Sequence, residues 1–376
     1  MRIAVNTRLL LANKLEGIGW FTFETLKRIT RNHPEHQFIF IFDRAYDQQF
    51  VFSENITPVV APPPTRHPLL WWFWFEFVIP RVLKKYKADL FLSTDGYISL
   101  RSKVPALDVI HDINFAHRPQ DLPWKFRTYY NHFFPKFAKH TTRIATVSDY
   151  SKQDLVKTYS IPGSKIDVVY NGSHEMYQPL SEEQKHNTRE RFTNGTDYFV
   201  FVGALHPRKN IARLLQAFDL FRTKTASAIK LVIVGGKLFK SGDIYETYRH
   251  LHFKEDVIFT GRLEPEDLKS VMGSAIALTF VPLFEGFGIP VVEAFNSNTP
   301  VIASNVTSLP EVAGEAALLV DPKSIDEISG AMLKITTDSE YRSELIKRGK
   351  IQREKFSWDK TAAKLWSSME KTMAGK

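Results

Sequence analysis

Short apolar runs recur along the whole chain, separated by helix-length stretches, and this alternation constrains the fold more than any other feature. The runs are rich in Ile, Val and Phe. Runs that are apolar throughout are typical of parallel strands covered by helices on both faces. The predicted strands are 3–10, 38–43, 88–93, 106–112, 143–148 and 166–172 in the first half, and 198–204, 230–236, 256–261, 275–281, 300–304 and 316–321 in the second.

Because strands alternate with helices in both halves of the chain, the sequence predicts two doubly wound α/β domains in tandem. A chain of 376 residues is also long for one hydrophobic core. The predicted domains are 1–177 and 178–355, with the polar stretch 178–197 as the connection, followed by an amphipathic helix in 356–376. Open parallel sheets bind ligands at the carboxyl ends of their strands, so we expect the site in a cleft that the two domains face.

The composition indicates the cellular compartment in which the protein works. Cysteine is absent, which excludes disulfides and cysteine metal sites and is compatible with a reducing cytoplasm. The N-terminal stretch lacks a signal-peptide pattern, and no run reaches the roughly 20 apolar residues that span a bilayer. We therefore expect a cytoplasmic protein.

The positive charge is unevenly distributed. Residues 1–180 contain 23 Lys+Arg and 16 Asp+Glu and so carry +7 of the net +9. This excess fits an anionic partner, such as membrane phospholipid or a phosphorylated substrate, or simply keeps the protein soluble. No basic-aromatic motif of a nucleic-acid module occurs, so nucleic acid is not an expected partner.

Two loops that follow predicted strands fit phosphate binding. GALHPRKN (203–210) places Arg208 and Lys209 between a strand and a helix, as in a diphosphate site or a solvated basic turn. The first strand is followed by Gly17 and Gly19, which leave room for a ligand close to the backbone. As a dinucleotide fingerprint this loop fails, because Thr22 occupies the place of the third glycine.

Candidate acid and base groups follow other strands. His111 ends the strand 106–112, and LFEGFGIPVVEAF (283–295) contains Glu285 and Glu293, eight positions apart. These two glutamates could be an acid/base pair, two ligand-binding carboxylates, or an ordinary turn that enters a helix. No His/Asp/Glu set has metal-ligand spacing, and no G-x-S-x-G nucleophile motif occurs, so no metal and no cofactor are expected.

Taken together, GALHPRKN, VIFTGRLEPEDLKSVMGSA and PLFEGFGIPVVEAFNSNTPVIASNVTSLPEVAGEAALLVDP carry a family likeness. The chain resembles the retaining GT-B-fold glycosyltransferases of family 4 (glycosyl transferases group 1), which include many mannosyltransferases. The resemblance implies a metal-independent hexosyltransferase (EC 2.4.1.-) that moves a sugar, with mannose as the best guess, from a nucleotide-sugar to a glycan or lipid-linked oligosaccharide in surface polysaccharide biosynthesis. The donor implied is GDP-mannose, with a UDP-sugar as the alternative, and the C-terminal helix is expected to pack back toward the first domain.

The resemblance also implies roles for individual residues. Glu293 holds the ribose hydroxyls, Glu285 lies against the donor sugar, and Arg208 and Lys209 neutralise the diphosphate. The first-domain residue His111 lies near the sugar. The other implied donor contacts are Gly17 and Gly19 under the diphosphate, the backbone amides of Gly286, Phe287, Gly288 and Ile289, and Arg262 near the base.

Two alternatives share the expected fold. One is a GT-B nucleotide-sugar epimerase, which lacks a Glu-x7-Glu signature, and the other is a non-catalytic sugar-nucleotide-binding subunit.

The aromatic run LLWWFWFEFVIPRVLKK (69–85) stands apart from these motifs. One interpretation is an interfacial helix that docks on the anionic inner face of the cytoplasmic membrane, with Arg81, Lys84 and Lys85 beside its aromatic residues. The other is a buried helix of the first domain.

Overall fold

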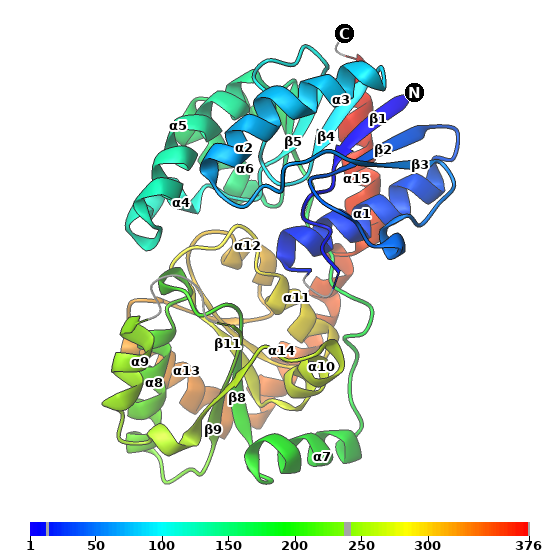
Figure 1. The fold of residues 1–376 in the computed structure, drawn as a ribbon. Helices are drawn as coiled ribbons and strands as arrows, with labels where there is room; N and C mark the ends of the chain where they lie inside the picture. The colour runs from blue at the N-terminus through cyan, green and yellow to red at the C-terminus, as the bar shows by residue number, and fades with distance from the viewer. Residues whose placement is uncertain (13–14, 237–241, 375–376) are drawn as a thin grey trace. The chain divides into compact units, whose positions relative to one another are not determined.

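A computed structural model describes residues 1–12, 15–236 and 242–374 of the chain. It divides into two compact units (Figure 1). Unit 1 comprises Met1–Pro119, Pro123–Gly172 and Trp358–Lys376, and unit 2 comprises Gln120–Leu122 and Ser173–Ser357. Each unit is built on one parallel sheet, so the prediction of two doubly wound α/β domains is confirmed.

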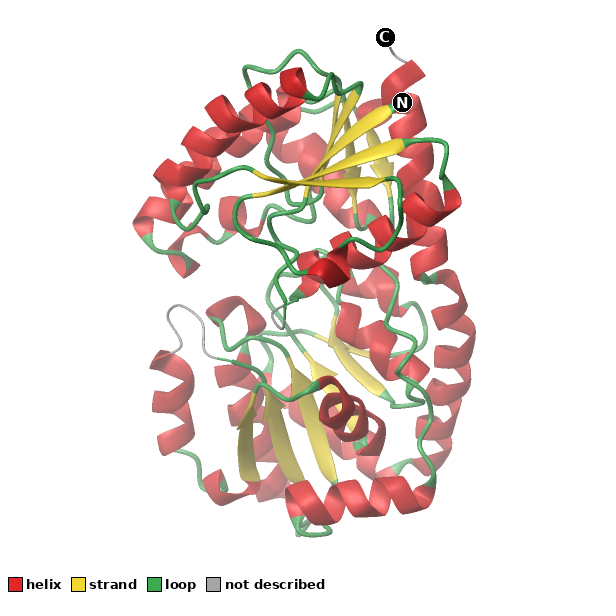
Figure 2. Cartoon of the chain, turned by 45° about the vertical axis from the view of Figure 1, so that its right-hand side comes forward, coloured by secondary structure: helices red, strands yellow, loops and turns green. Residues whose placement is uncertain are grey.

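Unit 1 contains a seven-stranded sheet in the order β3-β2-β1-β4-β5-β6-β7, with every pairing parallel. Its central strands β4 and β5 are buried from end to end because helices cover both faces of the sheet (Figure 2). The strands are β1 (Arg2–Asn6), β2 (Gln37–Phe42), β3 (Ile56–Val60), β4 (Leu90–Ser93), β5 (Ala106–Val109), β6 (Arg143–Thr146) and β7 (Ile166–Val168).

The helices of unit 1 include the last helix of the chain. α15 packs against α1, where Trp366 stacks on His33 with the ring centroids 3.6 Å apart. Leu365 and Met369 of α15 are fully buried. The helices are α1 (Gly17–Asn32), α2 (Pro68–Phe73), α3 (Ile79–Lys85), α4 (Asn114–His117), α5 (Trp124–His140), α6 (Asp149–Tyr159) and α15 (Trp358–Ala374), with a π-helical turn at Trp74–Val78 between α2 and α3.

Unit 2 contains a six-stranded parallel sheet in the order β10-β9-β8-β11-β12-β13. Its strands are β8 (Tyr198–Val202), β9 (Lys230–Val234), β10 (Val257–Gly261), β11 (Ala277–Phe280), β12 (Val301–Ser304) and β13 (Leu318–Val320). Its helices are α7 (Glu182–Thr193), α8 (Ile211–Lys224), α9 (Gly242–Arg249), α10 (Pro265–Ser274), α11 (Ile289–Asn296), α12 (Leu309–Ala313), α13 (Ile325–Thr337) and α14 (Ser339–Gln352).

Both sheets reverse their direction of winding at one place. In unit 1 this switch point lies between β1 and β4, and in unit 2 it lies between β8 and β11. The loops that leave two such strands diverge to opposite faces of the sheet, which opens a crevice at the carboxyl ends where ligands bind in open α/β sheets. The loops after β8 and β11 contain Arg208, Lys209 and Glu285.

Two elements were absent from the sequence-based prediction. The edge strand β3 includes Pro58, a residue that argues against a strand in sequence and is tolerated only at an edge. The polar connection 178–197 contains α7, which packs against α10. Its N-terminus is a capping box, in which Ser181 and Gln184 each satisfy a backbone N–H of the other.

Candidate functional site

The loop after β8 is fixed to its neighbours by Asn210. Its side-chain amide donates to Val281 O (2.9 Å) and Pro322 O (2.7 Å), and the residue is 5% exposed. Asn210 also precedes α8 and has a left-handed backbone conformation, which asparagine tolerates better than most residues. The loops after β8, β11 and β13 are thereby held together. Sequence reasoning took Asn210 only as the start of a helix.

Three of the predicted site residues form one ion cluster. Arg208 Nη1 and Lys209 Nζ both donate to Glu285 Oε2, at 2.8 and 2.6 Å. Burial disfavours the charged carboxylate, but the charges of Lys209 and Arg208 outweigh this effect and lower the pKa of Glu285. One carboxylate balances only one of the two cations, so the cluster keeps a net positive charge that suits an anionic ligand.

A tight turn follows Glu285 and leads into α11. At Gly288 the backbone has φ +104°, and a Cβ there would lie 2.5 Å from Leu309 Cδ2, so only glycine fits. The fully buried hydroxyl of Ser308 contacts Glu285 O (2.9 Å) and Phe287 O (3.0 Å). The predicted backbone contacts Gly286 to Ile289 therefore lie in a rigid turn at the N-terminus of α11. The role of Ser308 depends on a contact more than 20 positions away and gave no signal in the sequence.

Glu293 lies on α11, apart from the ion cluster. It is half-buried, and the Tyr177 side chain is close enough to influence its charge. Burial raises the pKa of Glu293 to about 7, although the nearby Tyr177 hydroxyl acts in the opposite direction. The two glutamates thus differ in environment: Glu285 is neutralised by cations, and Glu293 titrates near neutral pH. This difference does not favour an acid/base pair that acts at a single bond.

Arg262 follows β10 at the same carboxyl edge of the sheet. The strand order places β9 between β10 and β8, so Arg262 leaves the sheet two strands away from the loop with Arg208. Its side chain is exposed. A contact with a part of the ligand distant from the diphosphate, such as the base, is compatible with this position.

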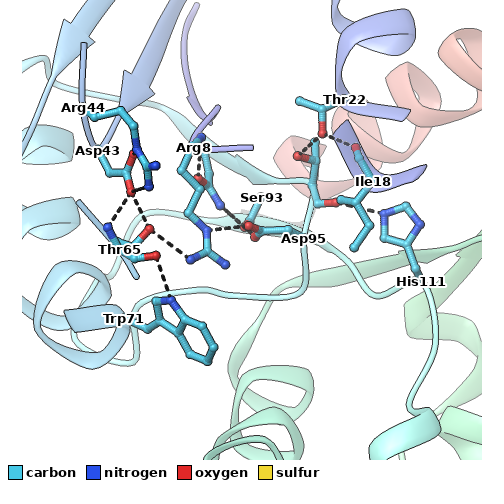
Figure 3. Close-up of polar contacts among 12 residues, drawn as sticks. Arg8, Ile18, Thr22, Asp43, Arg44, Thr65, Trp71, Ser93, Asp95 and His111 are labelled. Atoms are coloured by element: carbon cyan, nitrogen blue, oxygen red, sulfur yellow. Dashed lines mark hydrogen bonds and ion pairs between the residues drawn. The ribbon is translucent and has the colours of Figure 1, made fainter. Parts of the chain in front are cut away.

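In unit 1, the predicted residue His111 and the helix α1 are linked through Thr94, which follows β4. His111 Nε2 donates to Thr94 O (2.9 Å), and the Thr22 and Thr94 hydroxyls are 2.7 Å apart (Figure 3). Thr22 lies on α1, which begins at Gly17, so the glycine loop and His111 are joined through Thr94. Burial lowers the pKa of His111, so the neutral ring presents Nδ1 as an acceptor.

Gly17 and Gly19 differ in the space that a side chain would have at each position. A Cβ on Gly19 would lie 3.1 Å from Leu9 O and from a Leu15 side-chain atom, whereas nothing lies within 4 Å of a Cβ on Gly17. A side chain on Gly19 would therefore be tightly packed, whereas Gly17 leaves open space at the start of α1.

A second polar network of unit 1 was not predicted. Arg8, just after β1, donates to Asp95 (2.6 Å) and Thr65 (3.3 Å), and its guanidinium lies 4.3 Å from the centre of the Tyr97 ring (Figure 3). Asp43, after β2, accepts from Thr65 and Arg44. The network joins the carboxyl ends of β1, β2 and β4. Polar residues directly after apolar runs were the signal that could have revealed it.

Comparisons with known proteins match each half of the chain to a glycosyltransferase family. Residues 16–174 match "Glycosyltransferase Family 4", and residues 182–352 match "Glycosyl transferases group 1". The chain is a family 4 glycosyltransferase. O-antigen chain mannosyltransferase B from Escherichia coli is 27% identical over 357 residues, 92% of this chain and 93% of that protein. O-antigen chain mannosyltransferase RfbU from Salmonella typhimurium is 29% identical over 269 residues, 71% of each chain.

The solved structures give the same fold. The structure of HepE from Anabaena in complex with UDP and glucose superimposes with a TM-score of 0.78, at 14% identity, over 99% of this glycosyltransferase and 100% of that chain. The glycosyltransferase thus has the GT-B fold, as predicted from the resemblance.

No group of three or more His, Cys, Asp or Glu side chains suited to a metal ion occurs within residues 1–12, 15–236 and 242–374. Over the same residues, no helix has the length and apolar character needed to cross a bilayer.

The aromatic run of the glycosyltransferase is neither wholly buried nor wholly exposed. Trp71, Trp74 and Phe75 are buried, whereas Trp72 and Phe73 are each 39% exposed and Leu69 is 74% exposed. Trp71 packs on residues of α5, including Tyr130, which fastens α2 to α5. The buried-helix interpretation therefore fits one face of the run, and the interfacial interpretation fits the other.

Proposed function

We propose that this glycosyltransferase transfers mannose from GDP-mannose to a glycan or lipid-linked acceptor, with retention of configuration, in O-antigen or related surface polysaccharide biosynthesis. The observation that carries the proposal is the ion cluster of Arg208, Lys209 and Glu285 at the switch point of unit 2. The names of the two mannosyltransferase relatives support the sugar, and the UDP complex of HepE supports a nucleotide-linked donor. Membership of a glycosyltransferase family favours transfer over the epimerase and binding-subunit alternatives.

The cluster suits the departure of a nucleoside diphosphate. When the bond between the anomeric carbon and the diphosphate oxygen breaks, the electron pair stays on that oxygen and an oxocarbenium-like sugar forms. Arg208 and Lys209 then stabilise the new negative charge. The acceptor hydroxyl oxygen bonds to the anomeric carbon on the same face, and its proton passes to the departing phosphate oxygen. No enzyme nucleophile is required in this sequence.

We further propose that the reaction needs no metal ion, since the two cations provide the positive charge that a divalent ion would otherwise supply. Activity should be unchanged after dialysis against EDTA. Loss of activity that added Mg²⁺ or Mn²⁺ restores would contradict this part of the proposal.

A thermal-shift screen with GDP, UDP and ADP tests the donor. GDP should raise the unfolding temperature more than the other nucleotides, because a ligand that binds only the folded state stabilises it. A transfer assay with GDP-mannose, with the anomeric configuration of the product read by NMR, tests sugar and stereochemistry. Stabilisation by UDP alone would overturn the choice of GDP, and an inverted product would overturn retention.

We also propose that unit 1 contacts the anionic inner face of the cytoplasmic membrane. The surface in question, here called the aromatic–basic surface, comprises the exposed apolar side chains of α2 and α5 and the exposed cations beside them. Its apolar members are Leu69, Trp72, Phe73 and Trp124, and its cations are Arg81, Lys84, Lys85, Lys125 and Arg127. Exposed aromatic side chains beside lysine and arginine suit the interface of an anionic bilayer.

Co-sedimentation with vesicles tests this contact. The double variant Trp72→Ser/Phe73→Ser should lose binding to vesicles that contain phosphatidylglycerol while it remains folded. Trp74 is not a suitable target, although the sequence suggests it, because it is fully buried and its Nε1 donates to Ala61 O (2.6 Å). The matched control is Leu333→Ser/Ile351→Ser, which removes two exposed apolar residues of unit 2. Equal binding by the wild type and the Trp72/Phe73 variant would refute the membrane contact.

A further inference from the structure

A cavity of about 280 Å³ lies in unit 1 at the amino ends of β4, β5 and β6. Its wall includes Phe91 near the start of β4, Ala106 at the start of β5 and Thr142 just before β6. The switch point of unit 1 is at the carboxyl ends of the strands, so this cavity is separate from the crevice described above. Small-molecule sites begin at about 300 Å³, so the volume suits a group smaller than a nucleotide.

Three hydroxyl groups that line this cavity each have a hydrogen left to donate. Each oxygen accepts a hydrogen bond from a backbone N–H, which fixes the position of the side chain. The pairs are Ser99 with Arg101 N (3.2 Å), Ser102 with Val104 N (3.1 Å) and Thr142 with Ala106 N (3.2 Å). Within residues 1–12, 15–236 and 242–374, none of these hydroxyls donates to another residue. A hydroxyl that accepts one hydrogen bond can still donate its own hydrogen, so all three are donors available to a ligand.

The titratable side chains that line the cavity are basic. Lys103 and His140 both have exposed side chains, and His140 Nε2 lies 3.4 Å from Ser102 O. No lining residue has a carboxylate, and all of them belong to the described part of the chain. The carbonyls at the end of α5 would repel an anion, but Lys165 donates to two of them at 3.0 and 2.8 Å. The cavity therefore combines hydrogen-bond donors with positive charge.

We propose that this cavity binds a phosphate group, which accepts hydrogen bonds from Ser99, Ser102 and Thr142 and pairs with Lys103. Phosphate oxygens are strong acceptors, and lysine is a common partner for them. A sugar fits this lining less well, because its hydroxyls require acceptors as well as donors. The inference goes beyond the proposed transfer reaction, since none of the residues assigned to the sugar donor lines the cavity.

A soluble phosphate ion or ester and the headgroup of a phospholipid are the two sources of this chemistry. Arg101 precedes Ser102, and its guanidinium lies 4.2 Å from the centre of the Phe77 ring. Phe77 in turn stacks on Phe73 of the aromatic–basic surface, with 5.5 Å between the ring centres. The loop that contains Ser102 therefore borders the surface proposed to meet the membrane. The lipid source rests on that proposal, whereas the soluble source does not.

The unfolding midpoint, measured by tryptophan fluorescence, tests the soluble source, because all seven tryptophans lie in unit 1. Sodium phosphate should raise the midpoint more than sodium chloride of equal ionic strength, with each variant in chloride as its own reference. The apparent Kd, read from the dependence on phosphate concentration, should rise about 10-fold in Lys103→Gln and about 3- to 10-fold in Ser102→Ala. The control Lys157→Gln removes an exposed lysine of unit 1 outside the lining and should keep the wild-type Kd.

Co-sedimentation with vesicles of phosphatidylglycerol and phosphatidylcholine tests the lipid source. Ser102→Ala changes no charge, so weaker binding by this variant reports the cavity and not the surface charge. A raised Kd for phosphate in Ser102→Ala identifies a soluble ligand, and weaker vesicle binding without that change identifies a headgroup.

Wild-type behaviour of Ser102→Ala in both measurements overturns the proposal, even where Lys103→Gln is affected. In that case the membrane contact still stands if Trp72→Ser/Phe73→Ser loses vesicle binding. The transfer reaction is tested separately by the nucleotide screen, because its donor site is in unit 2.

Discussion

The carboxylate of Glu285 contacts both Arg208 and Lys209, the two cations that were expected to bind the diphosphate. The family resemblance implied that Glu285 lies against the donor sugar and that Arg208 and Lys209 bind the diphosphate, as separate contacts. The structure joins them through one carboxylate oxygen. An ion pair between positions 76 and 77 residues apart leaves no local trace in the sequence. Glu285 thus holds the two cations in place.

Lys209→Ala should reduce kcat by about 10²–10³, the usual effect of removing one preorganised donor from a developing anion. Lys209 is 8% exposed and is held by Glu285, so its position is fixed before the donor binds. Steady-state kinetics with saturating donor measure the effect. Lys224→Ala, which removes a lysine from a surface ion pair with Asp326, is the control. Transfer by Lys209→Ala at the wild-type rate would exclude the diphosphate clamp.

Glu285→Gln should lower the free energy of unfolding at pH 7 by about 1–3 kcal/mol, because two cations lose their shared carboxylate. The folded-state pKa of Glu285 lies below its ordinary value of 4.5, so the stabilisation is present above that pH and is lost as the pH falls through the folded-state pKa. Urea denaturation at several pH values should therefore show the difference shrinking in acid. A difference that stays constant down to pH 3 would contradict the ion-cluster account.

The same variant should bind a nucleoside diphosphate at least as tightly as the wild type, since the phosphates no longer compete with a carboxylate for Arg208 and Lys209. Calorimetric titration of Glu285→Gln measures this directly. Much weaker binding would mean that Glu285 itself contacts the nucleotide.

Most strands were predictable because their runs are apolar throughout, as helices on both faces of a sheet require. The exceptions have physical reasons. β3 was not predicted because it contains Pro58, and α7 was not predicted because its sequence is polar and it buries only Thr188 and Thr193. The turn and helix around Gly288 were predictable from the local amino-acid sequence. The contacts of Ser308 and Asn210 were not, because each joins segments distant in sequence.

α15 is an element whose packing can be tested alone. Leu365→Ala should destabilise unit 1 by about 2–5 kcal/mol, because Leu365 is fully buried and the surrounding core relaxes only in part around the cavity. Chemical denaturation followed by tryptophan fluorescence measures the change. Ala363→Ser, at an exposed position of the same helix, should have an effect below about 0.5 kcal/mol. A cost for Leu365→Ala as small as for the control would show that α15 contributes little to unit 1.

For the molecule as a whole, two units with separate cores imply two unfolding events. All seven tryptophans, Trp20, Trp71, Trp72, Trp74, Trp124, Trp358 and Trp366, lie in unit 1, so their fluorescence reports that unit, while far-ultraviolet circular dichroism reports both. A nucleoside diphosphate bound through Arg208 and Lys209 stabilises unit 2 by about 2.7 kcal/mol at 100 times its Kd.

The expected result is that the nucleotide shifts the circular dichroism transition upward and moves the fluorescence transition less. Leu365→Ala should show the reverse pattern. Identical shifts of both signals under both perturbations would mean that the two units unfold as one.

The return of α15 to unit 1 affects the order in which the chain can fold during synthesis. Residues 1–172 leave the ribosome first, but unit 1 lacks the helix that covers α1 until Trp358–Ala374 have been made. Unit 2 is continuous from Ser173 to Ser357, apart from three residues, and can complete its core earlier. The unit that is translated first is therefore the one that finishes folding last, and its apolar surface along α1 stays uncovered until then.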